Sequence, residues 1–503
     1  MSAERIMFVG TTSDSGKSWA VTALCRILKQ RGKKVAPFKS QNMALNSFIT
    51  ADGKEMGRAQ VFQAEAAGVA PDVRMNPILL KPSTDSDAQI VFMGKVTGNM
   101  GAAEYQNYKP KLRTKVTNIF NSLAAENDVV VLEGAGSPTE INLSDNDIVN
   151  MGMAKMADAP VILVADIDRG GVYATIYGTI KLLPKEDQKR IKGIIINKFR
   201  GDESLLVSGN QMIEKLTGVP VIGVLPMTDI DLDDEDSVSL QSKRQTRDTT
   251  KDIDIAVITL SKISNFTDFH SLEIQPDVSV RYVRHADQVG TPDVLIIPGS
   301  KNTNEDMVFL RGKHLDMAIK EAAENGSQIV GICGGYQLLG NQLRDPESVE
   351  SDLKSQTGLG LLDTDTVFNE VKTTTQAEAK HDGQLLTGYE IHMGTTTLGP
   401  QMRPFSRIIS NNGKPTDRDD GAVNQDGSVF GTYLHGLFDN IDWTRQFLNS
   451  VREKKGLKPL GKAVERQFNT YKENQYDKLA NVFKEHVDMK RIDEILAASE
   501  NHE

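Results

Sequence analysis

Short apolar runs alternate with helical stretches along most of this chain, and this alternation constrains the fold more than any other feature. The first part of the chain contains IMFVG, KVAPF, DVVVLEG, PVILVAD, IKGIIINKF and VPVIGVL, each followed by Gly, Pro or polar residues. Continuous apolar runs of this length are typical of strands that helices cover on both faces of a parallel sheet. A second series follows later, with DIAVITL, SVRYV, DVLIIPG, QIVGIC and SVFGTYLHG. The pattern predicts an α/β fold with two parallel sheets.

The length and the charge pattern predict where the domains divide. A chain of 503 residues is too long for one hydrophobic core. The stretch TDIDLDDEDSVSLQSKRQTRDTTKD is heavily charged and has almost no apolar periodicity, which is typical of a linker. We therefore predict a first domain over residues 1–227, a polar linker over 228–251, a second domain over 252–445 and a helical C-terminal segment over 446–503.

The composition excludes several classes of protein. A net charge of −10 argues against a nucleic-acid partner and favours a small-molecule substrate. The two cysteines, Cys25 and Cys333, are too few for a disulfide scaffold and fit a reducing compartment. No apolar run is long enough for a signal peptide or a membrane span. We expect a cytoplasmic protein without a membrane partner, and the oligomeric state stays open.

The run GTTSDSGKS follows the first predicted strand and opens a helix, as a phosphate-binding loop does. Five residues, rather than the usual four, separate its first two glycines, and this longer loop resembles that of the dethiobiotin-synthetase-like ATPases. Backbone N–H groups of such a loop bind phosphates, its lysine neutralises their charge, and its last serine binds Mg²⁺. The alternative is a glycine-rich turn capped by serine. The predicted ATP-binding residues of the loop are Gly10, Thr11, Thr12, Ser13, Ser15, Gly16, Lys17 and Ser18.

Two further polar residues end predicted strands of the first sheet, at the edge where open α/β sheets bind ligands. Glu133 ends DVVVLE, and we predict that it binds Mg²⁺ together with Ser18. An exposed carboxylate at a strand end is the alternative. Asn197 ends IIIN, and in the resembling ATPases an asparagine at this place reads the adenine. We therefore add Asn197 to the predicted ATP site.

The stretch GICGGYQLLG places Cys333 where a buried strand breaks into a helix. The glycines permit a sharp turn, and the N–H groups at a helix start favour a thiolate and hold a developing oxyanion. The pattern G-x-C-x-G-x-Q resembles the nucleophile turn of class I glutamine amidotransferases. The resemblance implies that Cys333 is the nucleophile and His435 its base. The N–H of Gly334, next to the thiol, and that of Gly299, which follows another predicted strand, are the predicted oxyanion donors. An ordinary turn at a strand end is the alternative for Gly299.

The partner of this base is open. Most class I enzymes have a glutamate two residues after the histidine, where this chain has Leu437. Asp439 lies near in the sequence but has no assigned role. The motif is therefore interpreted as a Cys–His pair.

A polar block between Lys39 and Pro82 contains more amides and charges than a core helix usually has. Such side chains suit a polar substrate, although a solvated helical face would also tolerate them. The substrate-site candidates in this block are Gln41, Asn42, Asn46, Asp52, Arg58 and Gln60.

Many motifs of one family occur in the expected order: QNMALNS, DGKEMGRAQ, MNPILLKP, EINLSDNDIVNMGMA, ADIDRGGVYA, INKFRGD, ISNFTDF, PGSKNT, GICGGYQ, GYEIHMG and YLHGLFDN. From Gly10 to about Ala480 the chain resembles the cobyric acid synthase family, the CobQ-type amidotransferases of cobalamin biosynthesis. The resemblance implies a P-loop domain of the dethiobiotin-synthetase type, which binds ATP and a corrinoid, followed by a flavodoxin-like class I glutaminase domain. Asp147 and Asp166 fall where the family has acids near its substrates, although each could instead cap a helix or end a strand.

The activity that this resemblance implies is that of a glutamine-hydrolysing carbon–nitrogen ligase. Its substrates would be ATP with Mg²⁺, glutamine and adenosylcobyrinic acid a,c-diamide, whose b, d, e and g carboxylates it would amidate to give adenosylcobyric acid. The nearest alternative is a cobyrinic acid a,c-diamide synthase, which chooses other carboxylates. A partition-type ATPase switch would need no thiol nucleophile. A degenerate glutaminase that only binds proteins would need neither Cys333 nor His435.

Overall fold

The computed structural model describes residues 3–83, 87–232, 240, 243–461 and 467–500. The chain forms two compact units. The first unit comprises Met1–Met43, Met56–Asp233 and Lys472–Glu503, and the second comprises Ala44–Glu55 and Asp234–Tyr471. The predicted boundaries at residues 227, 252 and 445 stay predictions, and the predicted linker over 228–251 lies partly outside the described residues.

The first unit is built on a six-stranded sheet in the order β12-β11-β10-β1-β9-β2, and all neighbouring strands are parallel. Its strands are β1 (Glu4–Gly10), β2 (Val35–Phe38), β9 (Val129–Glu133), β10 (Val161–Asp166), β11 (Ile191–Phe199) and β12 (Val221–Pro226). Each corresponds to one of the apolar runs in the sequence. A smaller sheet consists of β3 (Gln41–Met43), β6 (Ile78–Pro82), β7 (Asp87–Phe92) and β8 (Lys95–Gly101).

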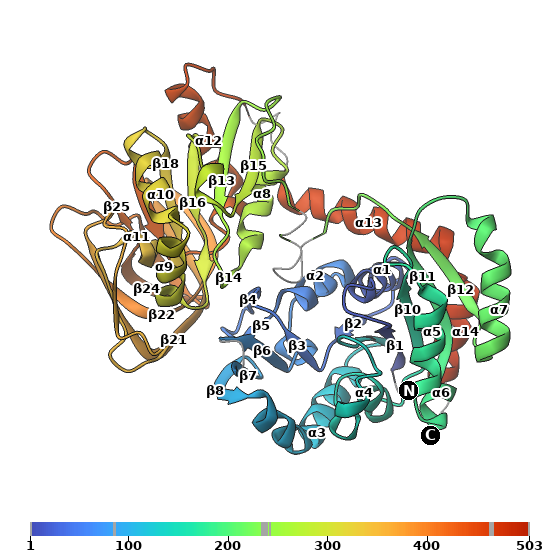
Figure 1. Cartoon of the computed structure of the whole chain (residues 1–503). Helices are drawn as coiled ribbons and strands as arrows, with labels where there is room; N and C mark the ends of the chain where they lie inside the picture. Colours follow the sequence, from blue (N-terminus) through green and yellow to red (C-terminus); the bar gives the residue numbers. More distant parts are fainter. Residues whose placement is uncertain (1–2, 84–86, 233–239, 241–242, 462–466, 501–503) are drawn as a thin grey trace. The chain divides into compact units, whose positions relative to one another are not determined.

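Helices flank the large sheet of the first unit (Figure 1). They are α1 (Lys17–Gln30), α2 (Arg58–Ala67), α3 (Ala102–Ala124), α4 (Met151–Met156), α5 (Val172–Leu182), α6 (Lys185–Arg190) and α7 (Val207–Thr217), with 3₁₀ turns η1 (Val73–Met75), η2 (Ile141–Asn146) and η3 (Glu203–Leu206). The C-terminal helices α13 (Phe468–His486) and α14 (Met489–Glu500) return to this unit. Ile492 and Ile495 pack in one buried cluster with Ile6 and Phe8, and the N–H of Arg5 donates to Ser499 Oγ at 2.9 Å. The last helix therefore covers the first strand.

The second unit has its own six-stranded sheet, in the order β15-β13-β16-β18-β26-β25, which is parallel except for its edge strand β25. Its strands are β13 (Ile253–Ile258), β15 (Val278–Val283), β16 (Val294–Ile297), β18 (Gln328–Ile332), β25 (Ala422–Val423) and β26 (Val429–Thr432). Its helices are α8 (His270–Glu273), α9 (Thr303–Gly312), α10 (Leu315–Glu324), α11 (Gly334–Leu339) and α12 (Ile441–Lys454), with η5 (Phe266–Phe269), η6 (Ala286–Gln288) and η7 (Leu437–Asp439). The predicted fold class, an α/β chain with two parallel sheets, is confirmed.

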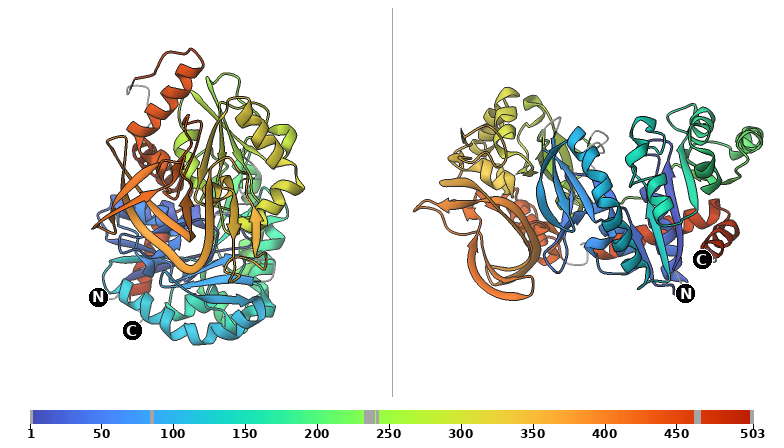
Figure 2. Two further views of the ribbon diagram at one scale, coloured as in Figure 1. Left: turned by 90° about the vertical axis from the view of Figure 1, so that its left-hand side faces the viewer. Right: turned by 90° about the horizontal axis from the view of Figure 1, so that it is seen from below.

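A second sheet in this unit was not predicted from the sequence. It contains β19 (Gln342–Arg344), β20 (Ser355–Thr357), β21 (Thr364–His381), β22 (Gln384–Leu398), β23 (Ser406–Asn411) and β24 (Lys414–Asp420). The hairpin β21–β22 is long and curved (Figure 2). Short pairs complete the unit, with β14 (Ile263–Ser264) antiparallel to β17 (Gly299–Ser300). The segment Ala44–Glu55 contains β4 (Ser47–Ile49) and ends where β5 (Glu55–Gly57) begins.

Candidate active sites

The predicted phosphate loop lies between the end of β1 at Gly10 and the start of α1 at Lys17. Gly16 precedes the helix with φ 99°, a conformation that favours glycine. A Cβ atom at Gly16 would lie 1.9 Å from Nδ2 of Asn197, which donates to the Ser15 carbonyl oxygen at 3.0 Å. Asn197 therefore lies against the loop, and no side chain fits between them; its predicted role in reading the adenine stays a prediction.

The lysine and the serine at the end of the loop both contact polar groups at the carboxyl end of the sheet. Lys17 Nζ donates to the carbonyl oxygens of Thr12, at 3.0 Å, and Gly136, at 3.3 Å. Ser18 Oγ donates to Glu133 Oε1 at 2.9 Å. The structure thus brings together the predicted nucleotide residues Gly10, Thr11, Thr12, Ser13, Ser15, Gly16, Lys17, Ser18, Glu133 and Asn197.

Glu133 is almost fully buried and accepts hydrogen bonds from three side chains. Besides Ser18, these are Lys39, whose Nζ lies 2.8 Å from Oε1, and Gln63. Burying an ion pair costs several kcal/mol per ion before its attraction repays it, so such a pair points to function more than to stability. Lys39 had no predicted role, although it follows a strand at the same sheet edge, just as Glu133 does.

The pair Ser18 and Glu133 fits a magnesium site. Mg²⁺ prefers oxygen ligands and usually binds one or two protein groups together with substrate phosphates and water. The described residues contain no group of three or more His, Cys, Asp or Glu that would hold a metal by itself. A hydroxyl and a carboxylate beside the phosphate loop therefore suit a nucleotide-bound Mg²⁺ rather than a resident metal.

The polar block of the sequence divides between the two units. Gln41, Asn42, Arg58 and Gln60 belong to the first unit, and Asn46 and Asp52 to the second. Helix α2 buries Arg58, Gln60 and Gln63, so the alternative interpretation of a solvated face is wrong for this helix. Within the described residues, Nε2 of Gln60 and Oε1 of Gln63 have no hydrogen-bond partner. Unpaired buried amide atoms are costly, so a polar ligand or an ordered water molecule would stabilise both side chains.

Asp147, Asp166 and Asp52 have structural partners. Asp147 accepts hydrogen bonds from the backbone N–H groups of Val149, Asn150 and Gly152 and so caps the start of α4. The other two carboxylates form ion pairs with lysines at 2.8 Å, Asp166 with Lys198 and Asp52 with Lys54. The structural alternatives for Asp147 and Asp166, a helix cap and a strand end, are therefore what the contacts favour.

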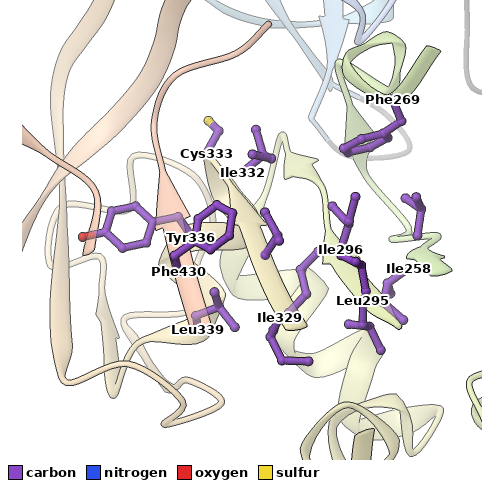
Figure 3. Packing of buried hydrophobic residues seen from close by; sticks show 14 of the residues in the cluster. Ile258, Phe269, Leu295, Ile296, Ile329, Ile332, Cys333, Tyr336, Leu339 and Phe430 are labelled. Atoms are coloured by element: carbon purple, nitrogen blue, oxygen red, sulfur yellow. The ribbon is translucent and has the colours of Figure 1, made fainter. Parts of the chain in front are cut away.

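Cys333 stands directly after β18, at the N-terminus of α11 (Figure 3). Its backbone has φ 52° and ψ −109°, a conformation that a residue with a side chain rarely adopts. The Sγ atom points away from the packed residues of the strand and lies 3.4 Å from the carbonyl oxygen of Ile391. The turn predicted from the glycines is thus present, and the strained backbone presents the thiol at the edge of the sheet.

Replacement of Gly335 by alanine is expected to destabilise this turn. A Cβ atom there would lie 1.9 Å from the carbonyl oxygen of Ile297, so the backbone would have to move, at a cost of about 2 kcal/mol or more. The midpoint of urea unfolding measures the loss. Gly312→Ala is the matched control, because its Cβ would meet nothing within 4 Å, and its midpoint should not fall. Equal midpoints for the two variants would contradict the prediction.

The imidazole of His435 is buried between the carboxylate of Asp268 and the thiol of Cys333. Its Nδ1 lies 2.7 Å from Oδ2 of Asp268, and the N–H of Gly436 donates to Oδ1 of the same carboxylate at 3.2 Å. Burial alone lowers the pKa of His435, but the Asp268 carboxylate and the Cys333 thiol raise it to about 10. Since Nδ1 faces Asp268, Nε2 is left for the thiol.

Asp268 is therefore the partner that the sequence left open. It is buried in η5 and lies 167 residues before the histidine. Asp268 belongs to the ISNFTDF motif, but nothing in the sequence pairs that motif with His435. Asp439 instead accepts a hydrogen bond from Ser271, and Leu437 is buried in the core. The sequence motif by itself indicates a Cys–His pair. The structure adds the carboxylate of Asp268, so that Cys333, His435 and Asp268 lie in a row.

The predicted oxyanion donors lie beside this chain. A Cβ atom on Gly299 would be 3.3 Å from Cε1 of His435, and one on Gly334 would be 2.7 Å from the N of Ser300. Ser300 Oγ donates to the buried Asp306 at 2.6 Å, which fixes β17. The structure thus brings Gly299 and Gly334 to the thiol site from two different elements.

His392 lies next to the same site. Its ring stacks on Tyr433 with centroids 3.7 Å apart, and its Nε2 lies 3.9 Å from Oε1 of Glu390. Burial and the nearby Arg418 lower its pKa to about 3, so the ring is neutral at physiological pH.

Comparison with known proteins assigns both parts of the chain to known domain families. Residues 6–238 match the CobQ/CobB/MinD/ParA nucleotide binding domain, and residues 254–443 match the CobB/CobQ-like glutamine amidotransferase domain. The chain is 66% identical over 499 residues to the cobyric acid synthase of Limosilactobacillus reuteri, with 99% of each chain covered. It is 59% identical to that of Streptococcus sanguinis, over 98% of this chain and 99% of the other. It is 54% identical to that of Listeria innocua, over 98% and 96%. No helix in the described part of the chain is long and apolar enough to span a bilayer.

Proposed function

Because the chain belongs to the cobyric acid synthase family of glutamine amidotransferase ligases, we propose that it amidates adenosylcobyrinic acid a,c-diamide with ammonia taken from glutamine. ATP would drive the amidation of the b, d, e and g carboxylates, and the product would be adenosylcobyric acid. One observation carries the proposal: a single chain holds both a Cys333–His435–Asp268 arrangement and a phosphate loop with a buried carboxylate.

The thiol site supports glutamine hydrolysis in two steps. His435, oriented by Asp268, takes the proton of Cys333, and Sγ attacks the amide carbon of glutamine. The N–H groups of Gly334 and Gly299 stabilise the oxyanion. The imidazolium then gives its proton to the departing ammonia, a γ-glutamyl thioester remains on Sγ, and water hydrolyses it to glutamate.

The nucleotide site supports activation of the acceptor. The γ-phosphoryl group of ATP passes to a corrinoid carboxylate, which releases ADP and gives an acyl phosphate. Ammonia then attacks the acyl carbon and displaces phosphate to give the amide. Lys17 neutralises charge on the transferred group. Ser18 and Glu133 would hold Mg²⁺, which supplies further charge neutralisation. Free ammonia is mostly protonated at neutral pH, so the chemistry favours its delivery from glutamine within the same protein.

Polar groups of the first unit suit an acceptor that carries several carboxylates and amides. Arg58 supplies a positive charge, and Asn42 and Gln60 supply amides, all three buried. The unpaired atoms of Gln60 and Gln63 support this assignment. We therefore keep Gln41, Asn42, Arg58 and Gln60 as candidates for acceptor binding, and Asn46 and Asp52, which belong to the second unit, stay predictions.

Asp268→Asn is expected to slow glutamine hydrolysis by about 10²–10⁴-fold, because the amide no longer fixes the tautomer of His435 or stabilises its cation. The Asp268 carboxylate raises the pKa of His435, so its loss lowers that pKa. The alkaline limb of the kcat profile, where His435 loses the proton that ammonia needs, should therefore move to lower pH.

The measurement is glutamate release between pH 6 and 10. Asp439→Asn is the matched control, since that carboxylate accepts from Ser271 and not from His435. If Asp268→Asn kept the parental rate and alkaline limb, Asp268 would have no part in orienting the base.

The proposed function is tested by mass spectrometry. Purified protein is incubated with MgATP, glutamine labelled with ¹⁵N in its amide, and adenosylcobyrinic acid a,c-diamide. Stepwise gain of labelled amides, up to four per corrinoid, is the expected result. Labelling of cobyrinic acid at its a and c carboxylates instead would assign the earlier reaction. Consumption of ATP and glutamine without any labelled corrinoid would refute the proposal that a corrinoid is the acceptor.

A further inference from the structure

A short piece of the N-terminal sequence packs in the second unit. This segment, Ala44–Glu55, is called the strap below; the residues before and after it belong to the first unit. Ile49 of the strap is fully buried in a cluster with Tyr389 and Ile391, and the ring of Phe48 lies 5.4 Å from that of Tyr389. The glutaminase mechanism given above assigns the strap no task.

Strong contacts fix the strap at its C-terminal end. Glu55, 1% exposed at its side chain, forms an ion pair of 2.6 Å with Lys372 on β21. Thr374 Oγ1 donates to the carbonyl oxygen of Gly53 at 3.1 Å. A buried, charge-assisted pair holds its partners more firmly than a surface contact does. The strap is therefore an ordered part of the second unit.

Tyr389 connects the strap to the catalytic base. Its ring stacks on that of His435, with centroids 5.1 Å apart and planes 15° apart, and the two residues exchange backbone hydrogen bonds of 3.1 and 2.8 Å. Its hydroxyl donates to the carbonyl oxygen of Ser47 at 3.3 Å and accepts from Nδ2 of Asn265 at 3.1 Å. The N–H of Ser47 donates to Oδ1 of Asn265 at 3.1 Å, which closes the ring of contacts.

Asn265 also hydrogen-bonds to Asp268, the other residue that contacts His435. It has φ 53°, directly before η5, and its carbonyl oxygen accepts from the N–H of Asp268 at 3.1 Å. Tyr389 stacks on His435 and hydrogen-bonds directly to Ser47. Asp268 contacts Nδ1 of His435 and is linked to Ser47 through Asn265. A displacement of Ser47 would disturb the stacking and the carboxylate contact together.

The strap is continuous in sequence with the proposed acceptor site. Before it comes β3, where Asn42 Nδ2 lies 3.4 Å from Oε1 of Gln60, and after it comes α2, where Gln63 contacts Glu133. Substrates bound at these polar groups would therefore lie close in sequence to both ends of the strap.

We propose that Tyr389 is a positioning residue for His435, and that the strap, through Ser47 and Asn265, makes glutamine hydrolysis respond to binding of ATP and the acceptor. The inference rests on the proposed function, since it takes the corrinoid as the acceptor. Substrate binding shifts the strap toward the arrangement in which His435 is aligned, which requires a differential affinity for the two arrangements. Such coupling typically changes a rate or affinity by about 5–150-fold.

The test compares glutamate release with and without MgATP and adenosylcobyrinic acid a,c-diamide. Wild-type protein is expected to show stimulation within that range of about 5–150-fold. Tyr389→Phe keeps the ring but removes the hydroxyl, and it should lose most of the stimulation through kcat, with little change in KM for glutamine. Asn265→Gly keeps the backbone freedom that φ 53° requires and removes both side-chain bonds, so it should behave alike.

Tyr282→Phe is the matched control, because its hydroxyl donates to Glu273 at 2.7 Å in the same unit and does not contact the strap. Amidation of the corrinoid by wild-type protein is measured in the same samples. If wild type does not amidate it, the proposed function fails. If wild type does, but the two variants keep the full stimulation, or lose rate equally in both conditions, the coupling is overturned.

Discussion

Cys333→Ala is expected to lose glutamine-dependent amidation by at least about 10³-fold, because no other group at the site can form the thioester. Amidation supported by ammonium chloride should continue, since the phosphate loop and Glu133 belong to the other compact unit. The measurement is amide formation on the corrinoid with each nitrogen source, at a pH near 8.5, where more of the ammonia is unprotonated.

The chain supplies its own control in Cys25, the only other cysteine. That thiol is buried on α1, where burial raises its pKa and keeps it neutral, so Cys25→Ala should retain glutamine-dependent synthesis. A Cys333→Ala protein that still transferred glutamine nitrogen would refute the nucleophile. If the ammonia-supported reaction were lost as well, glutamine hydrolysis and activation of the carboxylate would depend on each other.

Lys17→Ala is expected to lose amidation with both nitrogen sources, by about 10²-fold or more, because it removes the charge that the phosphate loop directs at the transferred group. The Lys17 side chain now bonds to the Thr12 and Gly136 carbonyl oxygens, so it is already held in the loop. Phosphate release and amide formation are measured together, and both should fall.

Lys29→Ala, at the other end of the same helix, is the matched control. Its side chain is 37% exposed and lies 3.9 Å from Glu473, so its loss should change neither rate much. Normal ammonia-supported synthesis by Lys17→Ala would remove the loop from the proposed chemistry. Taken with Cys333→Ala, the two variants distinguish supply of nitrogen from activation of the carboxylate.

The features that were predicted correctly each depend on a short, continuous stretch of sequence. A buried parallel strand needs only one apolar run, and the phosphate loop and the Cys333 turn each join a strand, glycines and a helix within about ten residues. Even the contact of Asn197 with the loop follows from the rule that strand ends meet at one sheet edge.

The features that were missed depend on distant partners. Asp268 lies in the ISNFTDF motif, but nothing in the sequence links that motif to His435, and only the fold brings the two residues together. The hairpin β21–β22 buries only part of one face, so TTTQAEAKH has no apolar run to announce a strand. The strap is too short to show a domain boundary, and its place in the second unit is fixed by long-range pairs such as Glu55 with Lys372.

Strand β1 packs against helix α14, so this part of the core can form only after the chain between them has been synthesised. Arg5 bonds to Ser499, 494 positions later in the sequence. At roughly 5–20 residues per second, about 25–100 s of translation separate the two residues. During that interval Ile6 and Phe8 lack Ile492 and Ile495, with which they share a buried cluster. This part of the core is therefore complete only after helix α14 has been made.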